Sequence, residues 1–399
     1  MYKTDLFNRI LLVLFSGLLI VLPVSTAAVE SFVCLLLLNF LVFAFAGESR
    51  GALFKELFCN RFALAAFIFW LTLIPCVIAA GEYRSISFEA LFTKWGEGII
   101  IFVITYFAAL RHDPRRLIKF LLAGAAVVCV DGIIQKISGT SLLRGYPLHK
   151  GDSGSLGAVT GAFGHYNDFA GYLLIPFFLS LGLVFEKQRT KKRLIYAAVS
   201  MLIAVNIIFT CSRAGWLSVL CGFIAALAVF SGKQRGYILS IFILCGLTVW
   251  LMPDLRERFM FIFKPGGDSD RLRIWAAGLK MFLRHPLVGY GLNTFPRHLV
   301  NQIEIYPMYA HNCYLQILVE AGVIGFLGFC VFTATWLVTS IKYIAKFQDN
   351  IIINSLFCGL VAYSCVIFFD TQLYSLRTAV LFWIFTAVQA GYATSAARS

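Results

Sequence analysis

Charged residues are scarce in this sequence. Only 14% of its 399 residues are charged, whereas 60% are hydrophobic. Soluble domains average about 25% charged and roughly 45–50% apolar residues. This composition argues against a soluble domain and indicates a chain that lies largely within a membrane.

The sequence also lacks cysteine pairs with metal-ligand spacing. None of its eleven cysteines forms a CxxC pair, and most of them lie inside apolar runs, where cysteine behaves as a small hydrophobe. A disulfide between Cys211 and Cys313, which fall near one predicted face, is a possible but unsupported alternative. No carboxylate cluster suits an obligatory metal, so we expect neither a metal nor another cofactor.

Long apolar runs are what the sequence does contain. A bilayer core requires about 20 largely apolar residues, and runs of that length must be helical because no water satisfies their backbone groups. The alternating pattern of a membrane barrel is absent. The runs predict about twelve transmembrane helices at 7–28, 31–46, 62–80, 97–111, 117–137, 162–185, 194–211, 214–231, 236–253, 313–341, 351–370 and 376–394.

The placement of the basic residues sets the predicted orientation. A net charge of +14 would suit a nucleic-acid partner, but most Lys and Arg lie in short clusters between alternate apolar runs. This pattern orients helices with both termini in the cytoplasm. We therefore expect membrane lipids as partners, and no nucleic acid. Residues 1–28 also resemble a signal peptide, although an uncleaved first span is favoured because further spans follow at once.

One long loop interrupts the series of spans. The sequence predicts a single membrane domain with helices in 1–253, a large periplasmic loop at 254–312, and further helices in 313–399. An amphipathic helix is expected within the loop, capped by Ser269 or Asp270 and lying on the outer leaflet. Its predicted apolar face consists of Leu272, Trp275, Leu279, Phe282 and Leu283.

Two arginine patterns fall at the predicted outer face. Arg213 lies in a tight turn between two spans, where it either binds an anionic ligand or extends to the lipid headgroups. Arg271 and Arg273 are two residues apart and point roughly 200° away from each other on a helix. Only one of them is expected to face the bundle, and basic residues on such helices often serve membrane binding alone.

A third pattern begins at His311, where the long loop enters a span. The helix dipole there favours the neutral imidazole, which can accept a proton, although a lone histidine at a helix start is more often structural. Glu320 lies about 13 Å deeper along the helix, so it is expected to have a structural partner rather than to pair with His311. Gly322 and Gly325 are expected to permit close helix packing.

Read together, these patterns resemble the O-antigen ligase/polymerase family. The family signature contains Arg-x-x-x-Trp, then Pro-x-x-Gly-x-Gly-x-x-x-Phe, then His-Asn-x-Tyr-Leu-x-x-Leu-x-Glu-x-Gly-x-x-Gly. These stretches match Arg271 to Trp275, Pro286 to Phe295 and His311 to Gly325. Ser212 to Trp216 is similar to the family's upstream arginine motif, and Gly161 to Ala170 is similar to a glycine/asparagine turn found in many members.

The resemblance implies an all-helical, GT-C-like membrane glycosyltransferase that works without a metal. Such an enzyme would move an O-antigen glycan from undecaprenyl diphosphate to a hydroxyl of the lipid A–core oligosaccharide, at the periplasmic face of the bacterial inner membrane. Within the family we favour this ligase reaction of lipopolysaccharide assembly. A polymerase of the same family is the alternative. A lipid-glycan transporter or flippase is more distant, because the polar residues gather at one face and the two halves of the chain are not repeats.

The resemblance also assigns roles to residues. It implies that His311 is the general base or orients the acceptor, and that Arg213, with Arg271 or Arg273, binds the diphosphate. Asp131, inside a span, is interpreted as a buried polar pin. Possible contacts to the glycan or acceptor are His165, Asn167, Asp168, Asn312, Tyr314, Asp370 and Arg377.

Overall fold

The computed structural model describes residues 2–46, 60–150, 157–260, 269–303, 308–347 and 350–398. Within these ranges every regular element is a helix, and the pairing of extended backbone is limited to two isolated bridges near residues 140–158. The prediction of an all-helical chain is therefore confirmed for this part of the protein.

The helices follow one another along the chain, many of them with short connections. Their bounds are α1 (Tyr2–Val21), α2 (Thr26–Ala46), α4 (Arg61–Thr72), α5 (Ile74–Ala79), α6 (Arg84–Ala90), α7 (Glu97–Ala109), α8 (Pro114–Ser138), α9 (Tyr166–Val184), α10 (Thr190–Phe209), α11 (Arg213–Val229), α12 (Gly232–Leu251), α13 (Pro253–Met260), α14 (Ser269–Arg284), α15 (Phe295–Val300), α16 (Cys313–Lys346), α17 (Ile351–Phe369) and α18 (Leu376–Arg398).

Many of these helices are suited to cross a membrane. Within the described residues, nine helical stretches are long and apolar enough to cross a membrane: Thr26–Phe45, Arg61–Ala79, Gly81–Ala109, Pro114–Ser138, Tyr166–Val184, Thr190–Phe209, Gly232–Leu251, Cys313–Lys346 and Ile351–Phe369. Two shorter apolar helices cover Leu6–Val21 and Arg213–Val229. The chain thus fits a multi-pass membrane protein, and each of the twelve predicted spans overlaps a helix. A total of twelve crossings stays a prediction.

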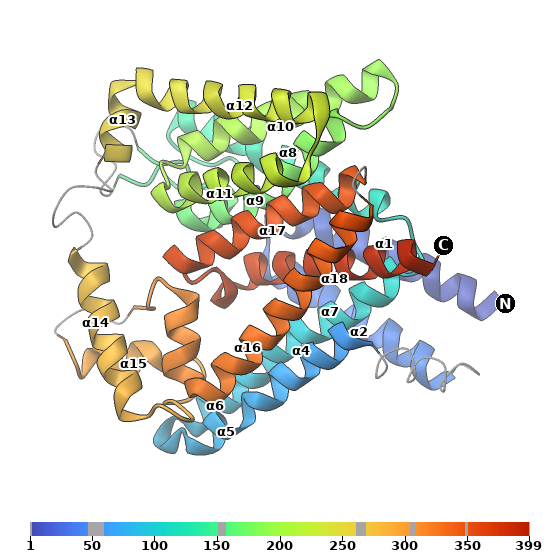
Figure 1. The fold of residues 1–399 in the computed structure, drawn as a ribbon. Coiled ribbons are helices and arrows are strands. Elements are labelled where there is room, and N and C mark those ends of the chain that lie inside the picture. Colours follow the sequence, from blue (N-terminus) through green and yellow to red (C-terminus); the bar gives the residue numbers. More distant parts are fainter. Residues whose placement is uncertain are drawn as a thin grey trace.

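The long helices form one bundle with a buried centre (Figure 1). In α9 89% of the apolar span is buried inside the protein, against 6% in α12, so α9 is central and α12 is peripheral. The two chain termini lie at one end of the bundle, and α13, α14 and α15 lie at the other, called here the loop end (Figure 1). This placement agrees with the prediction that both termini share one side.

Asp131 anchors the segment that follows α8. Its carboxylate accepts hydrogen bonds from the Ser141 hydroxyl at 2.7 Å and from the Leu143 backbone N–H at 3.0 Å. A buried carboxylate that receives two donors fixes the loop to the helix end. The interpretation of Asp131 as a buried polar pin is confirmed.

The amphipathic helix of the long loop is present as α14, and its position on the outer leaflet stays a prediction. Ile274, Ala277 and Met281 are buried in a small core shared with α15 and α16. The exposed face carries the leucines instead, with Leu272, Leu279 and Leu283 each more than half exposed. Ser269 and Asp270 lie inside the helix rather than capping it. The segments 261–268 and 304–307 of this loop are outside the described residues.

A break in α16 receives the loop that follows α14. Gly322 has non-helical angles (φ 63°, ψ −170°), which frees the carbonyls before it. The backbone N–H groups of Tyr290 and Gly291 donate to the carbonyls of Val319 and Glu320 at 3.1 and 2.9 Å. Gly322 therefore allows a loop to dock on α16, whereas it was expected to permit helix packing. Gly325 does face α4, as expected.

Replacing Gly322 by alanine is expected to destabilise the protein by about 2 kcal/mol or more, because a side chain at positive φ is strained. Its Cβ would also lie 2.2 Å from the Leu287 carbonyl oxygen. Thermal unfolding in detergent measures the effect. Gly236→Ala is the matched control, since a Cβ there meets no atom within 4 Å. Equal melting temperatures for the two variants would contradict the prediction.

Candidate active site at the loop end

His311 is held in an unusual backbone conformation at the start of α16. It directly precedes the N-cap Asn312, whose side chain accepts from the Leu315 N–H at 3.0 Å. Among the described non-glycine residues only Cys211, Asn293 and His311 have positive φ, at 52°, 59° and 49°. Such angles are uncommon and tend to persist where function requires them. All three fall within the sequence motifs.

Asp370 is the partner of His311. The Nδ1 atom of His311 lies 3.3 Å from Oδ1 of Asp370, which also accepts from the Thr371 backbone N–H at 2.7 Å. The His311 side chain is 28% exposed and that of Asp370 is 9% exposed. Because a carboxylate only accepts, Nδ1 carries the proton toward Asp370, and in the neutral form of the ring Nε2 has the lone pair. The pair joins the start of α16 to the end of α17 and leaves a basic nitrogen available.

Positive charge surrounds the Asp370 carboxylate. Burial by itself raises the pKa of Asp370, but the hydrogen bond and charge of His311 and the charges of Arg271 and His165 outweigh it and lower the pKa to about 2. Asp370 is therefore ionised at neutral pH. The same electrostatic influence places Arg271 and His165 near the His311–Asp370 pair.

The structure separates the two arginines of α14. Arg271 is half-buried and its charge acts on Asp370. One turn further along the same side, the Trp275 indole donates to the Ala310 carbonyl at 2.9 Å, beside His311. Arg273 is 57% exposed and lies 3.8 Å from Asp270 of its own helix. Arg271 faces the site, and Arg273 faces away from it.

Arg213 begins α11 in a turn that is tied to the same region. Ser212 caps this helix and its hydroxyl donates to Oδ1 of Asn167 at 2.7 Å. The Asn167 carbonyl in turn accepts from the Gln372 side chain at 3.1 Å, two residues after Asp370. Asn167 thus links the Arg213 turn to the Asp370 segment, and it acts by positioning rather than by facing the site.

His165 caps α9 beside this link. Its Nδ1 accepts from the Asn167 backbone N–H at 3.3 Å, which puts the proton on Nε2. Burial lowers the pKa of His165, and the nearby His149, His311 and Arg271 lower it further while Asp370 opposes them. The His165 ring stacks on Tyr166, with centroids 4.6 Å apart. His165 can donate one hydrogen bond toward the site.

Four of the predicted contact residues serve the fold. Asn312 caps α16, and the Tyr314 hydroxyl donates to the Ser364 carbonyl at 2.9 Å. Arg377, only 8% exposed, donates to the carbonyls of Pro23, Ala162 and Phe163. Asp168 is half-buried near Arg377 and hydrogen bonds with Gln372 and Ser375. These hydrogen bonds hold together the segments around the site, and contacts of the four side chains with sugar stay a prediction.

Glu320 organises the loop above the break in α16. Its fully buried carboxylate accepts from the backbone N–H groups of Asn293 (2.8 Å) and Phe295 (3.1 Å), and from the side chains of Tyr374 (2.8 Å) and Gln316 (3.2 Å). The expected structural partner is thus the loop itself. Tyr374 and Gln372 lie outside the motifs, so no sequence pattern indicated their roles.

Neither a disulfide nor a metal cluster occurs at this site. Cys211 and Cys313 are both free and buried, so the possible disulfide between them is not formed. In the described ranges no group of three or more His, Cys, Asp or Glu side chains is arranged to hold a metal ion. The groups that can act chemically are therefore His311, Asp370, His165, Arg213 and Arg271.

Comparison with known proteins adds one finding. No curated protein matches the chain. Residues 197–330, about a third of its length, match the family described as O-antigen ligase. This stretch contains Arg213, Arg271 and His311. The match supports the resemblance predicted from the motifs, so that residues 197–330 are similar to the O-antigen ligase family.

Proposed function

We propose that the protein is an O-antigen ligase. It transfers a glycan from undecaprenyl diphosphate to a hydroxyl of the lipid A–core oligosaccharide at the periplasmic face of the inner membrane. The observation that carries the proposal is the His311–Asp370 pair, 3.3 Å apart, with Arg271 close enough to act on the same carboxylate. The family match over residues 197–330 supports the reaction class.

The geometry suggests how the residues divide the reaction. Nε2 of His311 takes the proton from the acceptor hydroxyl as its oxygen forms a bond to the anomeric carbon. The bond from that carbon to the diphosphate oxygen breaks, and the diphosphate leaves with the electron pair. Asp370 stabilises the imidazolium that forms, in the manner of a carboxylate that orients a catalytic histidine.

The leaving group requires a positive environment. We assign this role to Arg213 and Arg271 of the motif stretches, because a guanidinium binds two phosphate oxygens at once. Charge that grows on the diphosphate as its bond breaks is stabilised by such preorganised donors. No step in this mechanism calls on a metal, because the arginines supply the electrostatic stabilisation.

A reconstituted reaction tests the proposal. Purified protein in detergent should join a lipid-linked glycan to lipid A–core without any added nucleotide sugar, and the product should shift on a gel. Because detergent contains no compartments, transport cannot produce this shift. Elongation of glycan on the lipid donor, with the acceptor unused, would instead identify a polymerase and overturn the ligase assignment.

The two arginines of α14 provide a matched pair of variants. Arg271→Ala is expected to lower kcat/KM by about 10²-fold, the scale for losing one preorganised donor. Arg273→Ala should change it by less than about twofold, since exposed charges contribute little. Initial rates at several donor concentrations measure both. Equal losses in the two variants would contradict the assignment of Arg271 to the site.

A further inference from the structure

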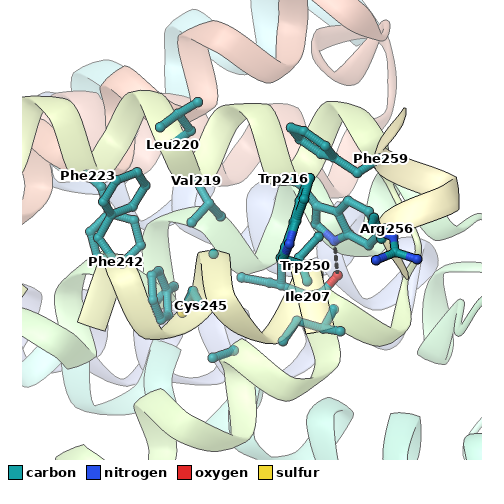
Figure 2. Close-up of a pocket in the computed structure, with 15 residues that line it drawn as sticks. Ile207, Trp216, Val219, Leu220, Phe223, Phe242, Cys245, Trp250, Arg256 and Phe259 are labelled. Carbon is teal, nitrogen blue, oxygen red and sulfur yellow. Dashed lines mark hydrogen bonds between the residues drawn. The ribbon is translucent and has the colours of Figure 1, made fainter. Parts of the chain in front are cut away.

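An apolar cavity lies beside the active site, between α9, α10, α11 and α12, with α13 across one end. Its volume is about 250 Å³. Figure 2 shows its length: Phe223 and Phe242 lie at one end, and Arg256 and Phe259 lie at the other. Arg256 is the one charged residue among those that line it.

The cavity exists because α12 stands away from the bundle. Ile238 is the single buried residue of this helix, and Gly246 places no side chain in the space. On the opposite wall the Trp216 indole donates to the Ile207 carbonyl at 3.1 Å, which fixes the ring (Figure 2). The wall formed by α11 is therefore fixed within the protein, and α12 closes the space from the outside.

One end of the cavity adjoins the Arg213 turn. Trp216 is three residues after Arg213, about 4.5 Å down the helix at 1.5 Å per residue. The buried Arg258 donates to the Cys211 carbonyl at 3.3 Å, and this bond holds α13 against the same turn. The end that carries Arg256 therefore lies next to the proposed diphosphate site.

The other end reaches toward the middle of the membrane. Phe223 is ten residues after Arg213, about 15 Å down α11. The hydrocarbon core of a bilayer is about 30 Å thick, so this distance spans about one leaflet. The cavity thus has the direction and polarity of a lipid, with cations at the headgroup end and aromatic rings along the chain.

We propose that this cavity binds the part of the donor's polyprenyl chain that adjoins the diphosphate. The inference rests on the proposed function, because it assumes that Arg213 binds that diphosphate. Aromatic walls suit the flat, methyl-branched isoprene units, which gain free energy by leaving water or disordered lipid for a shaped apolar site. The acceptor's acyl chains are the less suitable occupant, since their sugar meets His311 at the start of α16 rather than α11.

Filling the cavity tests the inference. Gly246→Trp places a large ring in the cavity, and a Cβ at this position meets no atom within 4 Å. Gly236→Trp is the matched control, because Gly236 lies on the same helix with equal space and does not line the cavity. Each variant is assayed with two donors that carry the same glycan, one on the full polyprenyl chain and one on a short, water-soluble isoprenoid.

The measured quantity is the ratio of kcat/KM for the long-chain donor to that for the short-chain donor. Gly246→Trp should lower this ratio at least tenfold, while Gly236→Trp should leave it as in the wild type. An unchanged ratio in Gly246→Trp overturns the inference. It is also overturned if Gly246→Trp instead weakens the dependence of the rate on the acceptor's acyl chains. Failure of the wild type to use either donor overturns the proposed function itself.

A second measurement does not depend on turnover. A photoreactive polyprenyl diphosphate without glycan should crosslink to α11 and α12 in the wild type and in Gly236→Trp, with the label lost in Gly246→Trp. Label found on other helices, or kept in Gly246→Trp, overturns the assignment of the cavity.

Discussion

Replacing His311 by alanine is expected to reduce glycan transfer by about 10²–10⁴-fold, the usual contribution of a positioned general base. The side chain is partly exposed and its main packing role is the contact with Asp370, so membrane insertion and folding should persist. Rates with purified protein, together with its elution from a sizing column, measure both effects. Near-normal transfer by the variant would remove His311 from the mechanism.

Asp370→Asn is the companion to this variant. The amide keeps the shape of the side chain but no longer enforces a proton on Nδ1, so kcat should fall more than the KM for the donor changes. Because the folded-state pKa of Asp370 is about 2, below its ordinary value of 3.8, the carboxylate stabilises the fold fully above about pH 5. The stability difference between wild type and variant should therefore be constant from pH 7 to pH 5. It should shrink as the pH falls toward 2.

Arg213→Lys is expected to lower kcat/KM nearly as much as Arg213→Ala, by about 10²-fold. A lysine retains the charge but loses the two-pronged geometry that holds adjacent phosphate oxygens. Arg213 is the first residue of α11, and its turn is tied through Ser212 to Asn167. Another side chain at this position therefore has little freedom to adapt.

Arg273→Lys is the control for this substitution, because Arg273 is exposed and paired only within its own helix. Its rate should match that of the wild type. Full activity of Arg213→Lys, with the rate of the alanine variant reduced, would make Arg213 a general positive charge at the membrane surface rather than a phosphate ligand.

The membrane helices could be predicted from the sequence because the bilayer imposes length and hydropathy on each one separately. Their ends shift by a few residues, and the span expected at 97–111 belongs to a longer helical stretch, Gly81–Ala109. That stretch includes a short π-helical segment, Leu91–Gly96. Hydropathy identifies the apolar run and does not report where hydrogen bonding continues past it.

The face of α14 could not be predicted in the same way. The helix has apolar residues on two sides, Leu272 and Leu279 on one and Ile274 and Met281 on the other. Periodicity detects such stripes but does not tell which one another helix covers. The covering elements are separate helices, α15 and α16, so the outcome depends on tertiary packing.

The site itself was predicted in part. The motifs indicate His311, Arg213 and Arg271, whose roles remain predictions, and the structure brings their neighbourhoods together. The pairing of His311 with Asp370 crosses 59 residues of sequence, and Asp370 was expected only as a sugar contact. The bonds of Arg377 to three carbonyls likewise join segments that are distant in sequence, so no local pattern indicated them.

The break at Gly322 has a consequence for how the parts of the enzyme move. The loop after α14 is bonded to α16 on both sides of the break, through Val319 and Glu320 before it and Val323 and Ile324 after it. His311 directly precedes α16, and Arg271 lies on α14, which packs against α16. His311, the proposed proton acceptor, and Arg271, one of the two proposed diphosphate ligands, therefore belong to one rigid unit. We expect substrates of different bulk to be accommodated by motion of the α9–α11 side, with the spacing between these two groups preserved.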